Sequence, residues 1–111
     1  MHELATTKSI VAICQKQQET RQFRRVLEIK LRIGALSGIV PECLRDFFPY
    51  VSEGTVCEGA TLTWEAIPAA VRCEECGYEG TARGCDCPRC GSAAIRVIAG
   101  REFYVENISV E

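Results

Sequence analysis

The sequence has no excess of positive charge, no long apolar run, and only one histidine. The formal net charge of −2 has the wrong sign for steering toward nucleic acid or anionic lipid. The apolar run from Ile10 to Cys14 is too short for an export signal or a membrane span. One histidine, with no recognisable pairing of a nucleophile and a base, argues against a hydrolase. These absences disfavour a membrane protein, a nucleic-acid-binding protein and an enzyme.

What the sequence does have is eight cysteines in 111 residues. The start gives no sign of secretion, because the acidic Glu3 stands where a signal peptide carries lysine or arginine. We therefore expect a cytoplasmic protein whose cysteines stay reduced. In a reducing compartment, paired cysteines are more often metal ligands than disulfides.

Four of the cysteines form two pairs, each with two residues between its members and a glycine directly after it: Cys73, Cys76, Cys87 and Cys90. Such a pair can turn both sulfurs toward one point, and the glycine allows the positive φ that aims backbone N–H groups at the thiolates. Four thiolates suit tetrahedral zinc, with bonds of about 2.3 Å. Because four protein ligands leave no open coordination position, we predict a structural Zn(2+) and not a catalytic one.

Other interpretations of the cysteines stay open from the residues alone. The two pairs could form disulfides or hold a tetrathiolate iron. Cys85 lies two residues before Cys87 and could replace it as a ligand, although the second pair would then be lost. The three remaining cysteines lie apart in sequence and are interpreted as small buried hydrophobic residues: Cys14, Cys43 and Cys57.

The hydrophobic pattern predicts an α+β fold, with a small sheet of about three strands, two helices and an inserted zinc-ribbon-like mini-domain. A segment without proline or glycine, from Leu4 to about Gln18, predicts one helix. Pro41 opens a second helix, which Pro49 should bend or shorten. Alternating apolar and polar residues predict strands at 27–33, 61–67, 95–98 and 101–110. We expect a first domain at 1–69, completed by 96–111, and a zinc-binding domain at 70–95.

The one histidine, His2, has an unusual chemical option at its position. The α-amino nitrogen of Met1, the amide nitrogen of His2 and its imidazole can close adjoining chelate rings on one ion. Such nitrogen-rich donor sets favour Ni(II) or Cu(II) over zinc. Glu3 could add a carboxylate or orient the imidazole. A histidine near a chain end is more commonly an exposed residue without a ligand role, so position alone leaves both interpretations open.

Further stretches carry a pattern beyond the cysteine pairs. They are the opening residues 1–4, the strand at 27–34, the loop at 36–42, the segment 54–60, and the tail from 100–102 through 108–111. Together with the two cysteine pairs they closely resemble the HypA/HybF family of hydrogenase nickel-incorporation proteins. The resemblance covers essentially the whole chain, and the opening and the cysteine pairs are its most specific parts.

This resemblance implies a nickel metallochaperone with two domains, and it is what favours a metal role for His2. It assigns the Ni(2+) cargo to Met1 and His2, with Glu3 beside them, and zinc to the paired cysteines. It implies as partners a nickel-handling GTPase and the large subunit of [NiFe]-hydrogenase, with urease as a further client of some members. A homodimer is left open. The loop before Pro41 has no carboxylate, so an oxygen donor from that region would have to be Glu42.

The main alternative function is a nucleic-acid-binding zinc ribbon, because similar cysteine pairs occur in transcription and ribosomal proteins. Between residues 70 and 100, four arginines are balanced by four acidic residues: Arg72, Arg83, Arg89 and Arg96 against Glu74, Glu75, Glu79 and Asp86. A segment of this composition lacks the positive surface that nucleic-acid binding needs. Tight, salt-sensitive binding of DNA or RNA would favour this alternative.

Overall fold

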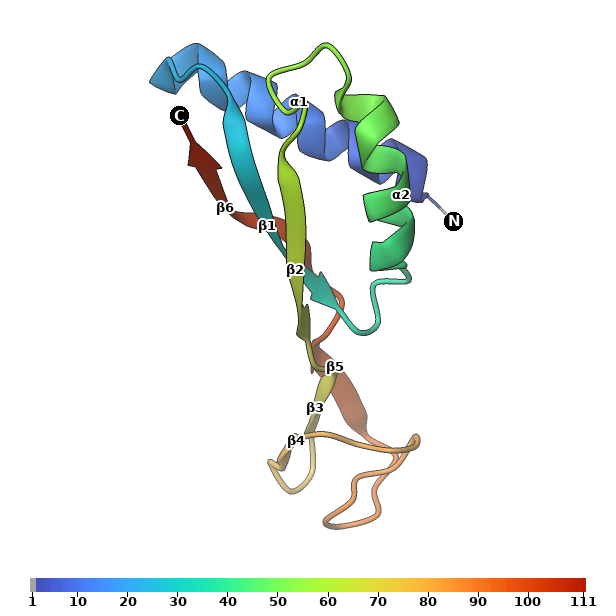
Figure 1. Ribbon diagram of the computed structural model, residues 1–111. Helices are drawn as coiled ribbons and strands as arrows, with labels where there is room; N and C mark the ends of the chain where they lie inside the picture. The colour runs from blue at the N-terminus through green and yellow to red at the C-terminus, as the bar shows by residue number, and fades with distance from the viewer. Residues whose placement is uncertain (1) are drawn as a thin grey trace. The chain divides into compact units, whose positions relative to one another are not determined.

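The computed structural model describes residues 2–111 of the chain (Figure 1). In chain order its elements are α1 (Glu3–Arg21), β1 (Val26–Gly34), α2 (Pro41–Ser52), β2 (Thr61–Ile67), β3 (Ala70–Cys73), β4 (Glu79–Gly80), β5 (Ile95–Ala99) and β6 (Phe103–Val110). They form two compact units. The first contains both helices and a sheet ordered β2-β1-β6, and the second contains a sheet ordered β4-β3-β5 and the paired cysteines. The predicted α+β fold is confirmed.

Helix α1 begins one residue earlier and ends three residues later than the sequence pattern predicts. The carbonyl of His2 accepts the first helical hydrogen bond, from the N–H of Thr6 at 2.8 Å. The helix ends where Gln22 adopts the left-handed conformation with φ 55° and donates its N–H to the carbonyl of Gln18 at 3.0 Å. Within residues 2–111, no helix is both long and apolar enough to cross a membrane.

Helix α2 starts with Pro41, whose missing N–H costs nothing in a first helical turn. Pro49 lies inside the helix, which runs three residues farther to Ser52, so the proline does not end the helix. Thr55 caps the end of the helix. Its N–H and its hydroxyl both donate, at 2.9 and 2.6 Å, to the carbonyl of Ser52, which otherwise lacks a partner within the helix. The burial of Phe48, which is only 5 % exposed, helps to offset the backbone donor lost at Pro49.

Strand β1 is the central strand of the larger sheet, between β2 and β6. Figure 1 shows both helices on one side of this sheet. Ile29 and Leu31 are completely buried, whereas the residues that alternate with them are partly exposed, as the period of two predicts. The other core residues of this unit come from the start of β1, from both helices, from β2 and from the loop after α2: Val26, Ile10, Val11, Cys14, Leu44, Phe48, Cys57 and Leu62.

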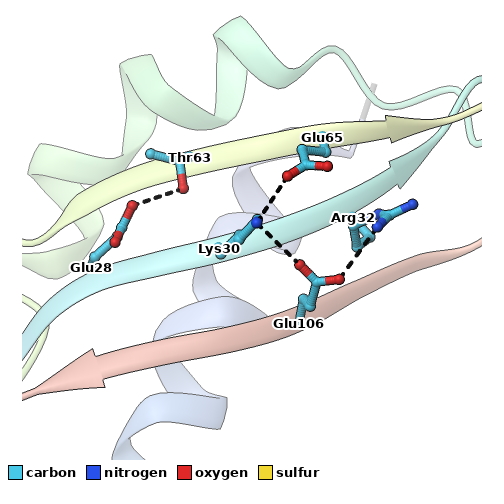
Figure 2. A network of polar contacts seen from close by, with 6 residues as sticks. All are labelled: Glu28, Lys30, Arg32, Thr63, Glu65 and Glu106. Carbon is cyan, nitrogen blue, oxygen red and sulfur yellow. Dashed lines mark hydrogen bonds and ion pairs between the residues drawn. The ribbon is translucent and has the colours of Figure 1, made fainter.

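The opposite face of the same sheet carries charged side chains that pair with one another (Figure 2). The Lys30 ammonium lies 2.8 Å from a carboxylate oxygen of Glu65 and 3.6 Å from one of Glu106. The Arg32 guanidinium lies 3.3 Å from the second oxygen of Glu106. Both cations of β1 on this face, Lys30 and Arg32, are therefore paired with carboxylates of neighbouring strands.

The smaller sheet is built around β3, which is antiparallel to both β4 and β5. Cys73 is the last residue of β3 and pairs with Ile95 of β5, while Arg72 pairs with Glu79 of β4. Val71 and Cys73 are buried in this unit, at 9 and 1 % exposure. The pairing of β3 with β5 therefore fixes the position of Cys73, the first cysteine of the first pair.

Gly34, at the end of β1, lies directly against the backbone of residues 100–102. Its N–H donates to the carbonyl of Glu102 at 2.7 Å, and a Cβ on Gly34 would stand 2.1 Å from the carbonyl oxygen of Gly100. Because backbone atoms cannot rotate away, Gly34→Ala is expected to lower the free energy of unfolding by about 3 kcal/mol. Chemical denaturation measures this change. Gly84→Ala is the control, because nothing lies within 4 Å of its added Cβ; similar unfolding midpoints for both variants would contradict the close approach.

Candidate metal centre

The four paired cysteines converge on one point, with all four sulfurs within 4.8 Å of one another. Two sulfur–sulfur distances, Cys73 to Cys90 and Cys76 to Cys87, are 3.6 Å. Four sulfurs bound at about 2.3 Å to one ion in a tetrahedron stand about 3.8 Å apart. The donor set therefore fits a tetrahedral metal ion without rearrangement of the backbone, and its four thiolates suit a soft or borderline ion such as zinc.

The two cysteine pairs have the same backbone structure. In the first, the N–H of Cys73 donates to the carbonyl of Tyr78 at 2.9 Å, and the N–H of Gly77 donates to the carbonyl of Cys73 at 3.0 Å. In the second, the N–H of Cys87 donates to Ser92 at 2.7 Å and that of Gly91 to Cys87 at 2.9 Å. Each loop needs a positive φ at its glycine, and Gly77 and Gly91 have φ values of 79° and 78°.

Backbone N–H groups point at the sulfurs, as the glycine positions predict. The first sulfur of each pair accepts the N–H of the second cysteine at 3.4 Å. The second sulfurs accept N–H groups from the residues after the glycines, Tyr78 for Cys76 and Ser92 for Cys90. These donors stabilise thiolates, which are the form that binds a metal.

The pKa values of Cys76 and Cys90 are shifted in opposite directions. The backbone N–H of Tyr78, assisted by the Arg89 guanidinium and neighbouring thiols, lowers the pKa of Cys76 to about 6. The N–H of Ser92 favours the Cys90 thiolate, but desolvation and the neighbouring cysteines raise the pKa of Cys90 to about 12. A divalent cation would stabilise all four thiolates at once and release the remaining protons.

The other cysteines lie outside this cluster. Cys85 is exposed, whereas Cys87 is 3 % exposed and belongs to the four-sulfur group. Cys14 and Cys57 are completely buried, in agreement with the interpretation as small core residues, and they hydrogen bond to each other. Cys43 is partly exposed, so its interpretation as a buried residue is wrong.

The predicted nickel ligands lie at the start of α1, and Met1 is outside the described residues. His2 is exposed and directly precedes the helix. Glu3 is only 6 % exposed, and its carboxylate accepts the N–H of Val40 at 3.2 Å. Because Val40 precedes the first residue of α2, Glu3 links the beginnings of the two helices. Glu42, the other candidate oxygen donor, is exposed in the first turn of α2.

Sequence reasoning missed four residues that contact these sites. Tyr78 and Ser92 could have been found, because each follows the glycine of its pair and supplies the N–H that the second sulfur needs. Arg89 contacts the opposite pair through its side chain, and Val40 contacts Glu3 through its backbone. Neither contact has a signal in the sequence, since both join residues brought together only by folding.

Known proteins similar to this chain share its whole length. Residues 1–110 match the family model described as HypA, hydrogenase/urease nickel incorporation, metallochaperone. The chain is 41 % identical to a hydrogenase maturation factor HypA of Geobacter metallireducens, with all of both chains covered. It is 35 % identical to one of Methanocaldococcus jannaschii, covering all of this chain and 98 % of the relative.

Two solved structures have the same fold. A solution structure of a HypA protein superimposes with a TM-score of 0.76 at 20 % identity, covering 100 % of this chain and 97 % of the other. The solution structure of the nickel metallochaperone HypA from Helicobacter pylori gives a TM-score of 0.71 at 20 % identity, covering 99 and 97 %. The full-length match, the identities and the four-cysteine centre together identify the chain as a member of the HypA family of nickel metallochaperones, which are non-enzymatic factors of hydrogenase maturation.

Proposed function

We propose that this chain binds its Ni(2+) cargo at the N-terminus, through the amine of Met1 and the amide and imidazole nitrogens of His2. The observation that supports this most is the placement of His2, which is exposed immediately before an ordered helix. Glu3 is held by the N–H of Val40, so its carboxylate serves to fix the start of α1 beside the nickel ligands, or to add one oxygen donor.

An exposed site with few protein donors suits delivery of a metal. A buried cage with a complete ligand set would retain its ion, whereas a terminal chelate can exchange it with a partner. Because amine and imidazole must lose protons to bind, nickel affinity should fall as the pH is lowered. We propose that the chain passes nickel to the large subunit of [NiFe]-hydrogenase together with a nickel-handling GTPase, with urease as a second client.

The second metal of the proposal is a resident structural Zn(2+) on Cys73, Cys76, Cys87 and Cys90. The sulfur geometry and the backbone N–H groups directed at the sulfurs support it. Bound zinc would supply positive charge that holds four thiolates together and would take no part in transfer. We accordingly assign the nickel role to the unit that contains both helices, and the zinc role to the unit that contains β3, β4 and β5.

The decisive test of the nickel proposal is a Ni(II) titration of the untagged chain and of His2→Ala, followed by calorimetry and by absorption spectroscopy. His2→Ala is expected to lose at least about 100-fold in nickel affinity, because it removes a metal ligand and not an outer contact. Lys8→Ala changes an exposed residue of α1 and is the matched control, whereas Glu42→Gln tests the other candidate oxygen donor. Hydrogenase activity of cells carrying each variant measures delivery; full affinity in His2→Ala would refute the proposed ligand.

The alternative of a nucleic-acid-binding zinc ribbon has less support. In the cysteine-rich unit the Arg96 guanidinium lies 2.8 Å from a carboxylate oxygen of Glu74, and that of Arg72 lies 3.7 Å from one of Glu79. Arginines neutralised in this way leave little positive charge for phosphates.

We propose that the protein is cytoplasmic, because thiols of this kind stay reduced in that compartment. A measurement of mass in solution tests whether it forms a homodimer.

A further inference from the structure

Arg89 lies between the two cysteines of the second pair, but its side chain reaches the first pair. Its guanidinium donates to the carbonyl of Cys76 and also interacts with the thiol of that residue. The carbon at the centre of the guanidinium stands 6.0 Å from the centroid of the Tyr78 ring. One side chain therefore contacts the backbone, the sulfur and the aromatic neighbour of the opposite cysteine pair.

The arginines of β3 and β5 differ from Arg89 in the groups that they contact. Arg72 and Arg96 each pair with a glutamate, Glu79 and Glu74 respectively. Among the described ion pairs, Arg89 contacts no carboxylate, although acidic residues are present in the same segment. Its positive charge is directed at the sulfur cluster instead.

The net charge of the four-thiolate site with its metal bound explains what the Arg89 guanidinium can do. Four thiolates and one divalent cation carry a net charge of −2, from four negative and two positive charges. A guanidinium beside one of the sulfurs offsets part of that charge and donates charge-assisted hydrogen bonds. Its planar fork can serve the carbonyl and the sulfur of Cys76 together, whereas a lysine ammonium would serve them as a point charge.

We propose that Arg89 is a positioning residue that ties the two cysteine pairs together across the bound metal and slows its release. This inference rests on the zinc assignment proposed above. Release requires one pair to swing away from the other, and that movement breaks the contacts of Arg89 with Cys76 and Tyr78. Arg89 therefore opposes the first step of metal loss without being a metal ligand.

The test measures the rate at which the zinc-loaded full chain loses zinc to an excess of EDTA. Arg89→Ala is expected to release zinc about tenfold faster than the native chain, the size expected for one hydrogen bond to a charged group. Arg89→Lys should lie between the two, because it keeps the charge and loses the fork. Arg96→Ala is the matched control, since it removes an arginine of the same unit that pairs with Glu74, and it should release zinc like the native chain.

A spectroscopic measurement separates this role from a general loosening of the unit. With Co(II) in the four-thiolate site, the sulfur-to-metal charge-transfer band should move to longer wavelength in Arg89→Ala, because a sulfur loses a hydrogen bond, and stay unchanged in Arg96→Ala. Tyr78→Ala should release zinc faster than the native chain, and it supplies the test should Arg89→Ala fail to fold.

The outcomes distinguish this inference from the zinc assignment on which it rests. Metal analysis of the native chain comes first, and absence of tightly bound zinc overturns the assignment. If the native chain holds one zinc and the rates of Arg89→Ala and Arg96→Ala are equal, whether fast or slow, the role of Arg89 is refuted while the zinc site stands. An unchanged cobalt spectrum in Arg89→Ala would refute it as well.

Discussion

Two residues added ahead of Met1, a glycine and a serine, are expected to lower the Ni(II) affinity of the chain at least about 100-fold. The extension converts the amine of Met1 into an amide in the middle of the chain, and the chelate through Met1 and His2 loses its terminal nitrogen. The imidazole stays in place, so this experiment tests the amine separately from the side chain. A Ni(II) titration followed by calorimetry gives the affinity, and absorption spectroscopy reports the change of ligand set.

The control for the extension is its removal. A protease that cleaves directly before Met1 restores the free amine, and the nickel affinity of the cleaved chain should return to that of the native protein. Zinc content should be the same in all three samples, because the sulfur centre belongs to the other unit. Nickel binding by the extended chain with unchanged affinity and spectrum would eliminate the terminal chelate.

Cys73→Ser is expected to abolish tight zinc binding and to unfold the cysteine-rich unit. Cys73 is 1 % exposed at the end of β3, and its backbone holds both Tyr78 and Gly77 in the first loop. Structural zinc contributes about 10–16 kcal/mol to the folding of small zinc-binding peptides, so a small unit without its metal lacks the free energy to stay ordered. Metal analysis should find less than one zinc per chain, and hydrogen exchange should show lost protection between residues 70 and 99.

Cys85→Ser is the matched control, because it removes an exposed thiol from the same unit. It should keep one tightly bound zinc and native hydrogen exchange. The nickel affinity of Cys73→Ser should stay within about threefold of native, since the terminal ligands lie in the other unit and effects at independent sites are roughly additive. Loss of zinc from Cys85→Ser, with zinc retained in Cys87→Ser, would show that the alternative ligand set is the correct one.

Much of the fold follows from patterns that are local in the sequence. The alternation around Ile29 and Leu31 is a strand because one face of β1 is buried under the helices and the other is not. Pro41 marks the start of α2 for a reason contained in its own ring. The effect of Pro49 cannot be predicted locally. The proline removes one backbone hydrogen bond of the helix, whereas the burial of Phe48, which helps to offset that loss, depends on the rest of the unit.

The sequence by itself determined the two cysteine loops, because each is built from hydrogen bonds within six consecutive residues and a glycine with positive φ. It also determined the family, whose motifs run along the whole chain. Only the tertiary structure brought the two loops together, tied Glu3 to Val40 and directed Arg89 at Cys76. Those contacts join residues that are distant in sequence or on separate loops, and their formation depends on the packing of many other residues. The spacing of the cysteines predicted that the two loops would share a metal, but no spacing rule predicts the contacts of Glu3 and Arg89, because a side chain's partner is set by where the folded backbone places it.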